Sequence, residues 1–142
     1  MKKILVIDDE WKIRKLIKDY LVREGYIVDE AGDGEEGIEK FFSNIYDIVI
    51  LDIMMPKIDG WSVCRKIREE SQVPIIMLTA RADESDQLFG FDLETDEYMV
   101  KPFNPKLLVA KVKALLRRDG KIIDKAPMVF GDLAIDGIKR EV

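Results

Sequence analysis

The stretch Ile4-Leu5-Val6-Ile7-Asp8-Asp9-Glu10 decides the fold, because four apolar residues run without interruption into three carboxylates. Two further apolar runs of the same length occupy residues 48–51 and 75–78. A strand with one solvated face alternates apolar and polar residues, whereas an unbroken run is typical of a strand buried on both faces. The three runs therefore predict the centre of a parallel sheet that is covered by helices on each side.

Helical patterns separate these runs. Apolar residues at 13, 16, 17, 20 and 21 fit one face of a helix, and Gly25 is expected to end it. Shorter patterns cover residues 38–45, 63–67 and 108–116, and a weakly amphipathic segment covers 83–93. With two weaker strands expected at 26–28 and 98–100, residues 1–118 are predicted to form an α/β domain with a five-stranded, doubly wound parallel sheet.

The pattern changes after residue 118. Asp119-Gly120-Lys121 is expected to break the last helix, which makes residues 119–127 a predicted linker. Apolar residues around Gly131-Asp132 then suggest one or two short strands. Residues 128–142 are too few for an independent core, so we interpret them as the first strand or strands of a truncated second domain.

The composition excludes several kinds of chemistry. The chain has 142 residues, a net charge of −5, no histidine and one cysteine. Histidine-based catalysis, histidine-ligated metals, an intrachain disulfide and a thiolate zinc cluster are therefore excluded. No apolar run reaches membrane-spanning length and the N-terminus does not fit a secretory signal, so the expected location is the cytoplasm, away from membranes.

Polar residues follow four of the predicted strands. Asp8 and Asp9 follow the first strand, and Asp52, Thr79 and Lys101 follow the third, fourth and fifth. Each residue alone could be a helix cap, a turn residue or a solvated charge. In an open α/β sheet, however, the carboxyl ends of the strands form the ligand-binding edge. A cluster of oxygen ligands there suits Mg²⁺ (or Mn²⁺), and a carboxylate could act as a nucleophile toward a phosphoryl group.

These motifs resemble the receiver domain of bacterial two-component response regulators. The resemblance rests on Asp8-Asp9, on Asp52 with the segment 54–60 (Met-Met-Pro-Lys-Ile-Asp-Gly), on Leu78-Thr79-Ala80 and on Lys101-Pro102-Phe103. It covers residues 2–118 and implies a flavodoxin/CheY-like strand order of 2-1-3-4-5. Residues 130–136 and 140–142 resemble the opening strands of the winged-helix DNA-binding domain of OmpR/PhoB-type regulators.

The resemblance implies a role for each residue at the strand ends. Asp52 would be the phosphoacceptor, and the metal would be held by Asp8, Asp9, Asp52 and the backbone carbonyl of Met54. Lys101 would pair with Asp52 and then with the phosphoryl oxygens.

Further family roles concern switching and phosphate lifetime. Thr79 would hydrogen-bond the phosphoryl group, and Tyr98 would rotate inward as Thr79 moves. The Lys101–Pro102 peptide bond would be cis. Met54 and Arg81 would tune the lifetime of the phosphoryl group.

The resemblance also implies partners. Because the chain has no histidine, the phosphoryl donor would be external, a phosphohistidine on a sensor histidine kinase. Phosphorylation would favour a homodimer through the face formed by the 83–93 helix, the fifth strand and the last helix, and DNA would be bound through the missing C-terminal domain. Gln87 and Leu107 replace a Lys–Glu pair that usually crosses this dimer. The charges left to tie it are Asp96, Glu97, Lys111, Arg117 and Arg118.

One face of the first predicted helix carries Trp11, Arg14, Lys15 and Lys18. The plain interpretation is a solvated basic face. The functional one is a docking surface for the kinase beside Asp8-Asp9, with Trp11 as an anchor.

Two other functions compete with a phosphorylated switch. A phosphatase of the haloacid-dehalogenase type would need a second Asp two residues after its nucleophile, and neither Asp8 nor Asp52 has one. A scaffold that only has the shape of a receiver would usually lack the acidic cluster or the lysine. For Trp61 and Cys64, packing is the favoured interpretation.

Overall fold

The computed structural model describes residues 1–80 and 96–124, with side chains described as far as Arg117. It divides into two compact units, Met1–Lys111 and Val112–Val142. The elements follow one another in this order: β1 (Lys3–Ile7), α1 (Trp11–Arg23), β2 (Ile27–Ala31), α2 (Gly34–Ser43), β3 (Ile48–Asp52), α3 (Gly60–Arg68), β4 (Ile75–Thr79), β5 (Glu97–Val100) and α5 (Pro105–Asp124).

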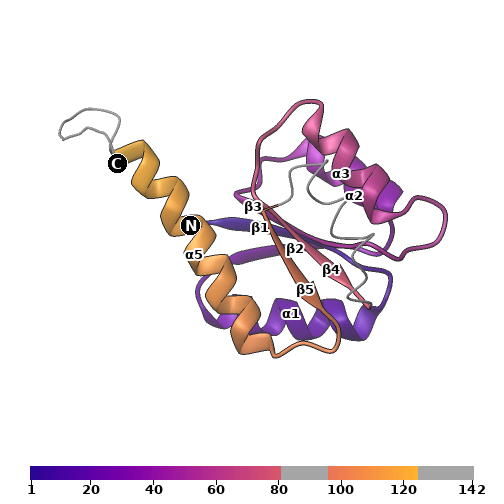
Figure 1. The fold of residues 1–142 in the computed structure, drawn as a ribbon, viewed down its shortest axis with the longest axis horizontal. Helices are drawn as coiled ribbons and strands as arrows, with labels where there is room; N and C mark the ends of the chain where they lie inside the picture. Colours follow the sequence, from indigo (N-terminus) through magenta and orange to yellow (C-terminus); the bar gives the residue numbers. More distant parts are fainter. Residues whose placement is uncertain (81–95, 125–142) are drawn as a thin grey trace. The chain divides into compact units, whose positions relative to one another are not determined.

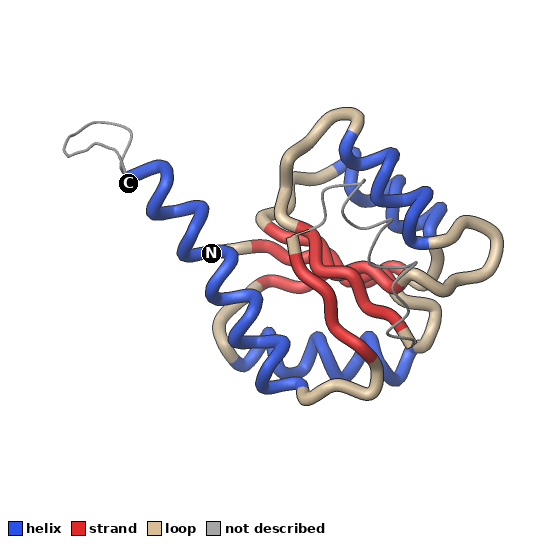
Figure 2. The backbone as a smooth tube through the Cα atoms, viewed as in Figure 1, coloured by secondary structure: helices blue, strands red, loops and turns tan. Residues whose placement is uncertain are grey.

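The strands form one parallel sheet in the order β2-β1-β3-β4-β5, which confirms the predicted fold and strand order (Figure 1). Every residue of β3 and β4 is buried, as their unbroken apolar runs predict. Helix α1 covers one face of the sheet, and α2 and α3 cover the other (Figure 2).

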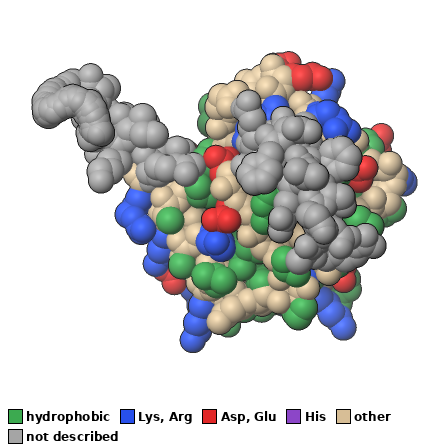
Figure 3. Space-filling view, viewed as in Figure 1, with side chains coloured by type: hydrophobic (Ala, Val, Ile, Leu, Met, Phe, Trp, Pro, Cys, Tyr) green, Lys and Arg blue, Asp and Glu red, His purple; other side chains and the backbone are tan. Residues whose placement is uncertain are grey.

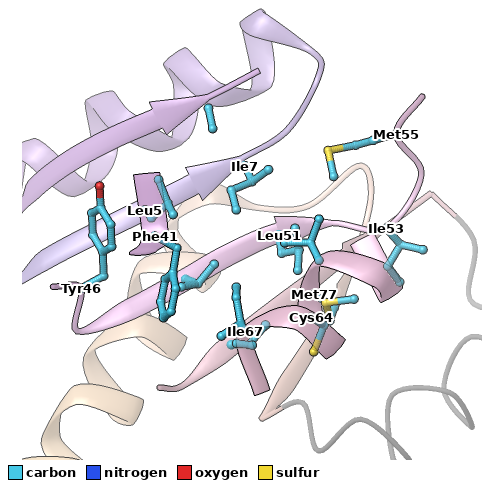
Figure 4. Close-up of a cluster of buried hydrophobic side chains, with 14 residues drawn as sticks. Leu5, Ile7, Phe41, Tyr46, Leu51, Ile53, Met55, Cys64, Ile67 and Met77 are labelled. Carbon is cyan, nitrogen blue, oxygen red and sulfur yellow. The ribbon is translucent and has the colours of Figure 1, made fainter. Parts of the chain in front are cut away.

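The core between the sheet and the α2–α3 layer is built from side chains of both. Leu5 and Leu51 from the sheet lie in one cluster with Phe41 from α2 and Cys64 and Ile67 from α3 (Figure 4). Cys64 is fully buried, and burial raises the pKa of its thiol to about 11. The packing role expected for Cys64 is thereby confirmed.

Local signals account for three of the helix ends. The side chains of Asp33 and Asp59 cap α2 and α3 by accepting hydrogen bonds from the backbone amides of Glu36 and Ser62, both at 2.8 Å. Gly25 adopts a φ of 92° just after α1, a conformation that glycine takes without strain.

Three local predictions were wrong. Helix α5 continues to Asp124 instead of breaking at Asp119-Gly120, since a glycine inside a helix costs only about 1 kcal/mol. Strand β2 overlaps the expected 26–28 but begins at Ile27 and continues to Ala31. Ile45 lies beyond the end of α2 and is 88% exposed, so it is not part of the buried helix face.

The predicted helix at 83–93 and the second-domain strands at 128–142 lie outside the described residues. Among the helices that are described, none has the length and apolar character needed to cross a membrane. Acidic and basic side chains are scattered over the face displayed in Figure 3 rather than gathered by sign.

Candidate functional site

The carboxyl ends of β1, β3, β4 and β5 bring the predicted site residues together. Asp8, Asp52 and Thr79 are buried, with exposed fractions of 0%, 2% and 3%, whereas Asp9 is exposed. One carboxylate oxygen from each of Asp8, Asp9 and Asp52 lies within 4.8 Å of the others. We call Asp8, Asp9, Asp52, Thr79 and Lys101 the carboxyl-edge group.

Lys101 lies among these carboxylates. Its Nζ is 2.9 Å from Asp8 Oδ2 and 3.5 Å from Asp52 Oδ2, and it is also 2.9 Å from Oε1 of Glu10. The backbone amide of Lys101 donates to the carbonyl of Thr79 at 2.7 Å, which fixes the end of β5 against the end of β4. The Lys101–Pro102 peptide bond is cis, as expected.

The loop after Asp52 holds this residue in place. The amide of Met54 donates to Asp52 Oδ1 at 3.3 Å, and the amide of Gly60 donates to the carbonyl of Ile53 at 2.8 Å. A Cβ atom at position 60 would lie 2.3 Å from the carbonyl oxygen of Asp52, so only glycine fits there. The steric role of Gly60 was not predicted, although the glycine directly after the capping Asp59 was a signal for it in the sequence.

The carboxyl-edge group has more carboxylates than ammonium groups. Burial, and then the neighbouring Asp8 carboxylate, raise the pKa of Asp52 to about 7, although Lys101 acts in the opposite direction. Burial opposes the charge of Lys101, but its hydrogen bonds with Glu10 and Asp8 prevail and raise its pKa. Within residues 1–80 and 96–117, Lys101 is the one Lys or Arg that pairs with the Asp8 or Asp52 carboxylate. Added positive charge beside these carboxylates would therefore favour the ionised form of Asp52.

Arg14 has a place in this site that the sequence did not reveal. Its Nη1 donates to the backbone carbonyl of Asp8 at 2.7 Å, and its Nε pairs with Glu30 at 3.1 Å. Arg14 thus braces the end of β1 and is not simply part of a solvated basic face. An arginine six residues after Asp8, on the first turns of the next helix, was the available signal.

The other proposed docking residues lie on the surface of α1. Trp11 is 60% exposed, Lys15 pairs with Asp19 at 3.3 Å, and Lys18 pairs with Glu30 at 3.5 Å. Their proposed contact with a kinase stays a prediction.

The charges expected on the dimer face are partly engaged within the chain. Asp96 accepts from the amide of Ile75 at 2.8 Å and pairs with Arg68 at 3.2 Å, and Glu97 pairs with Lys111 at 3.1 Å. Leu107 is 51% exposed. Arg81, Gln87 and the Arg118 side chain lie outside the described residues, and Arg117 is exposed.

Tyr98 and Met54 flank the site differently. The ring of Tyr98 is half-buried and meets Trp61 edge-on, with 6.5 Å between the ring centroids. Trp61 packs against the core cluster, as expected. The Met54 side chain is 59% exposed, directly after the buried Ile53.

The fold and this acidic edge define a class of protein. The chain matches the family described as "Response regulator receiver domain" over residues 4–113. It therefore belongs to the response regulator receiver family, as its motifs suggest.

Its curated relatives are transcriptional regulators. The transcriptional regulatory protein ResD of Bacillus subtilis is 49% identical over 141 residues, covering 94% of this chain and 59% of ResD. SrrA of Staphylococcus aureus is 49% identical over 115 residues, covering 81% of this chain and 48% of SrrA. The chain thus spans about half to three-fifths of the length of these relatives, which agree with the OmpR/PhoB-type resemblance.

Solved structures share the fold. A two-component response regulator from Clostridium difficile has a TM-score of 0.81 and 39% identity, covering 84% of this chain and 98% of that one. The response regulator TrrA from Thermotoga maritima, solved in complex with Mg²⁺-BeF, has a TM-score of 0.74 and 49% identity, covering 81% and 99% of the two chains.

Proposed function

We propose that this chain is a phosphorylation-dependent signalling switch in which Asp52 accepts a phosphoryl group from a sensor histidine kinase. The observation that carries the proposal is the buried Asp52 carboxylate. One of its oxygens lies within 4.8 Å of an oxygen of Asp8 and of Asp9, and Lys101 Nζ lies 3.5 Å from Asp52 Oδ2. The family and the regulators named above support the same function.

The donor set fits a hard divalent cation. Three carboxylates lie close together without His or Cys ligands, which suits Mg²⁺, or Mn²⁺, better than a softer metal. Asp8, Asp9 and Asp52 would hold the ion together with the carbonyl of Met54. The bound ion supplies positive charge that neutralises the carboxylates and the oxygens of a phosphoryl group.

The protein residues then perform the transfer. A carboxylate oxygen of Asp52 attacks phosphorus, the P–N bond of the donor phosphohistidine breaks, and its electron pair leaves with the imidazole. Lys101 faces Asp52 and neutralises charge on the phosphoryl oxygens, and the buried Thr79 hydroxyl hydrogen-bonds one of them. Met54 and Arg81 tune the access of water, and hence the rate of dephosphorylation.

The response would leave the site through Thr79 and Tyr98. Added charge on Asp52 favours one of two conformations, and the half-buried Tyr98 ring lies on the strand next to Thr79. We propose that this change promotes a homodimer through β5, α5 and the 83–93 segment, and that it controls DNA binding by a further domain.

Trp11, Arg14, Lys15 and Lys18 would contact the kinase. Trp11 would act as the anchor, since it is the most exposed aromatic side chain of α1.

The test is incubation with acetyl phosphate and Mg²⁺, followed by intact-mass measurement. The wild type is expected to gain the mass of one phosphoryl group, and the Asp52→Asn variant is expected to gain none. A wild type without any mass gain would contradict the proposal, as would equal gains in both proteins.

A further inference from the structure

Glu10 binds Lys101 more closely than Asp52 does. Lys101 Nζ lies 2.9 Å from Glu10 Oε1 and 2.9 Å from Asp8 Oδ2, but 3.5 Å from Asp52 Oδ2. An ammonium has three donors, and these contacts direct it toward three carboxylates. The two shortest contacts are made to the segment that joins β1 to α1, away from the proposed acceptor.

The two carboxylates that hold Lys101 differ in their freedom to release it. Asp8 is fully buried, and its Oδ1 accepts from the backbone amide of Glu10 at 2.9 Å. The Glu10 side chain is 58% exposed. Glu10 can therefore give up Lys101 and turn into water, whereas Asp8 would be left as an unpaired buried charge.

The Glu10 side chain serves the helix little. Glu10 is the N-cap residue of α1, yet its side chain makes no capping hydrogen bond. Its backbone carbonyl accepts from the amide of Arg14 at 3.1 Å, a contact that a change of side chain leaves in place. The ion pair with Lys101 thus directs the Glu10 side chain toward the carboxyl-edge group.

We propose that Glu10 is a positioning residue that holds the Lys101 ammonium toward β1 and competes with the modified Asp52 for it. This inference rests on the proposed function. The phosphoryl oxygens on Asp52 need the same ammonium, so Glu10 opposes the modified state until its carboxylate turns away. Its repulsion of the phosphoryl charge acts in the same direction.

The test is the affinity of the full chain for beryllofluoride, a phosphoryl mimic, measured by isothermal titration calorimetry at saturating Mg²⁺. Saturation with metal removes any effect of Glu10 on metal binding. Glu10→Gln is expected to bind beryllofluoride about two- to fivefold more tightly than the wild type, the range for a half-exposed ion pair. Glu39→Gln removes the same charge from an exposed position on α2 and is expected to match the wild type.

Glu10→Asp separates contact from charge. It keeps the carboxylate but shortens the side chain by one methylene, so it is expected to loosen the Lys101 contact and to follow Glu10→Gln. Thermal unfolding of each variant in the absence of metal verifies the fold.

The outcomes are distinguishable. Equal affinities of the wild type and Glu10→Gln would overturn the inference and leave the proposed function intact. A Glu10→Asp protein that matches the wild type would overturn it too, because charge alone would then explain the effect. A wild type that does not bind beryllofluoride would overturn the proposed function and this inference together.

Discussion

The acidic residues near the start of the sheet and those at its carboxyl edge are satisfied in different ways. Near the start, the amide of Lys3 donates to Asp47 at 2.8 Å, and Asp29 accepts from the hydroxyl of Tyr46 at 2.6 Å. Lys3 Nζ lies 3.7 Å from Asp29. We call Lys3, Asp29, Tyr46 and Asp47 the amino-edge group.

At the carboxyl edge, one ammonium serves several carboxylates. Lys101 pairs with Asp8, Glu10 and Asp52, and Asp9 adds a further acid nearby. The amino-edge group is completed by donors of the chain itself, so its role is structural. The carboxyl-edge group has one ammonium for several carboxylates, which is why we propose a cation-binding role for it.

The largest expected effect is a pH dependence that only the carboxyl edge produces. With the pKa of Asp52 raised to about 7, the folded protein is expected to keep this proton up to that pH, whereas an unfolded Asp releases it near pH 3.9. In metal-free protein, the free energy of unfolding should therefore fall as pH rises through this window, by at most about 4 kcal/mol. Asp52→Asn should lack this loss, so urea unfolding should give similar stabilities near pH 4 and a more stable variant at pH 8.

The difference between the two proteins isolates Asp52 from other groups, such as Glu36, whose pKa is lowered chiefly by the hydrogen bond from the Gly32 amide. If the difference in the free energy of unfolding between the wild type and Asp52→Asn were the same at pH 4 and pH 8, the pKa of Asp52 would not be raised in the folded protein.

The next effect concerns the ammonium. Lys101→Met should lower the free energy of unfolding by about 3 kcal/mol at pH 8 in EDTA, because Asp8 is left as a buried, unpaired charge. The loss should shrink toward pH 5, where Asp52 takes up a proton. Guanidinium unfolding at the two pH values measures this, and an equal loss at both would contradict it.

A smaller effect should follow the addition of metal. Mg²⁺ at about one hundred times its dissociation constant should stabilise the wild type by about 2.7 kcal/mol, since it binds the folded state. Asp52→Asn should lose most of this gain, as measured by the thermal midpoint with and without Mg²⁺. Equal gains in the two proteins would place the metal elsewhere.

The smallest effect lies in the amino-edge group. Tyr46→Phe removes the hydroxyl that binds Asp29 but keeps the ring stacked on Phe41, with centroids 6.3 Å apart. The expected loss is about 1 kcal/mol, and the gain from Mg²⁺ should be that of the wild type. A Tyr46→Phe protein that responds less to Mg²⁺ would show that the two edges are coupled.

The sequence predicted the sheet and the strand-end residues for one physical reason. A parallel strand buried on both faces leaves an unbroken apolar run, and the residue after that run lies at the ligand-binding edge. Asp8, Asp52 and Thr79 could therefore be assigned to this edge from the sequence alone.

Other features depend on contacts that spacing does not encode. Arg14 lies on the polar face of α1, yet its length allows it to reach back to the carbonyl of Asp8. The Asp96 carboxylate accepts a hydrogen bond from the amide of Ile75 at the start of β4, a contact that the sequence pattern does not predict. Helix α5 continues past Gly120 because the low helix propensity of one glycine is a small cost, which the other residues of the helix outweigh.

The absence of a side chain at position 60 has a mechanical consequence. The first turn of α3 rests directly on the main chain of the residue proposed to be modified, with no rotatable group between them. A displacement of the peptide at residue 52 would be passed to α3 as rigid movement, since no rotamer change is available to absorb it. If Asp52 is modified as proposed, α3 would therefore be a second element that can move with the site, in addition to the proposed change at Tyr98 on β5.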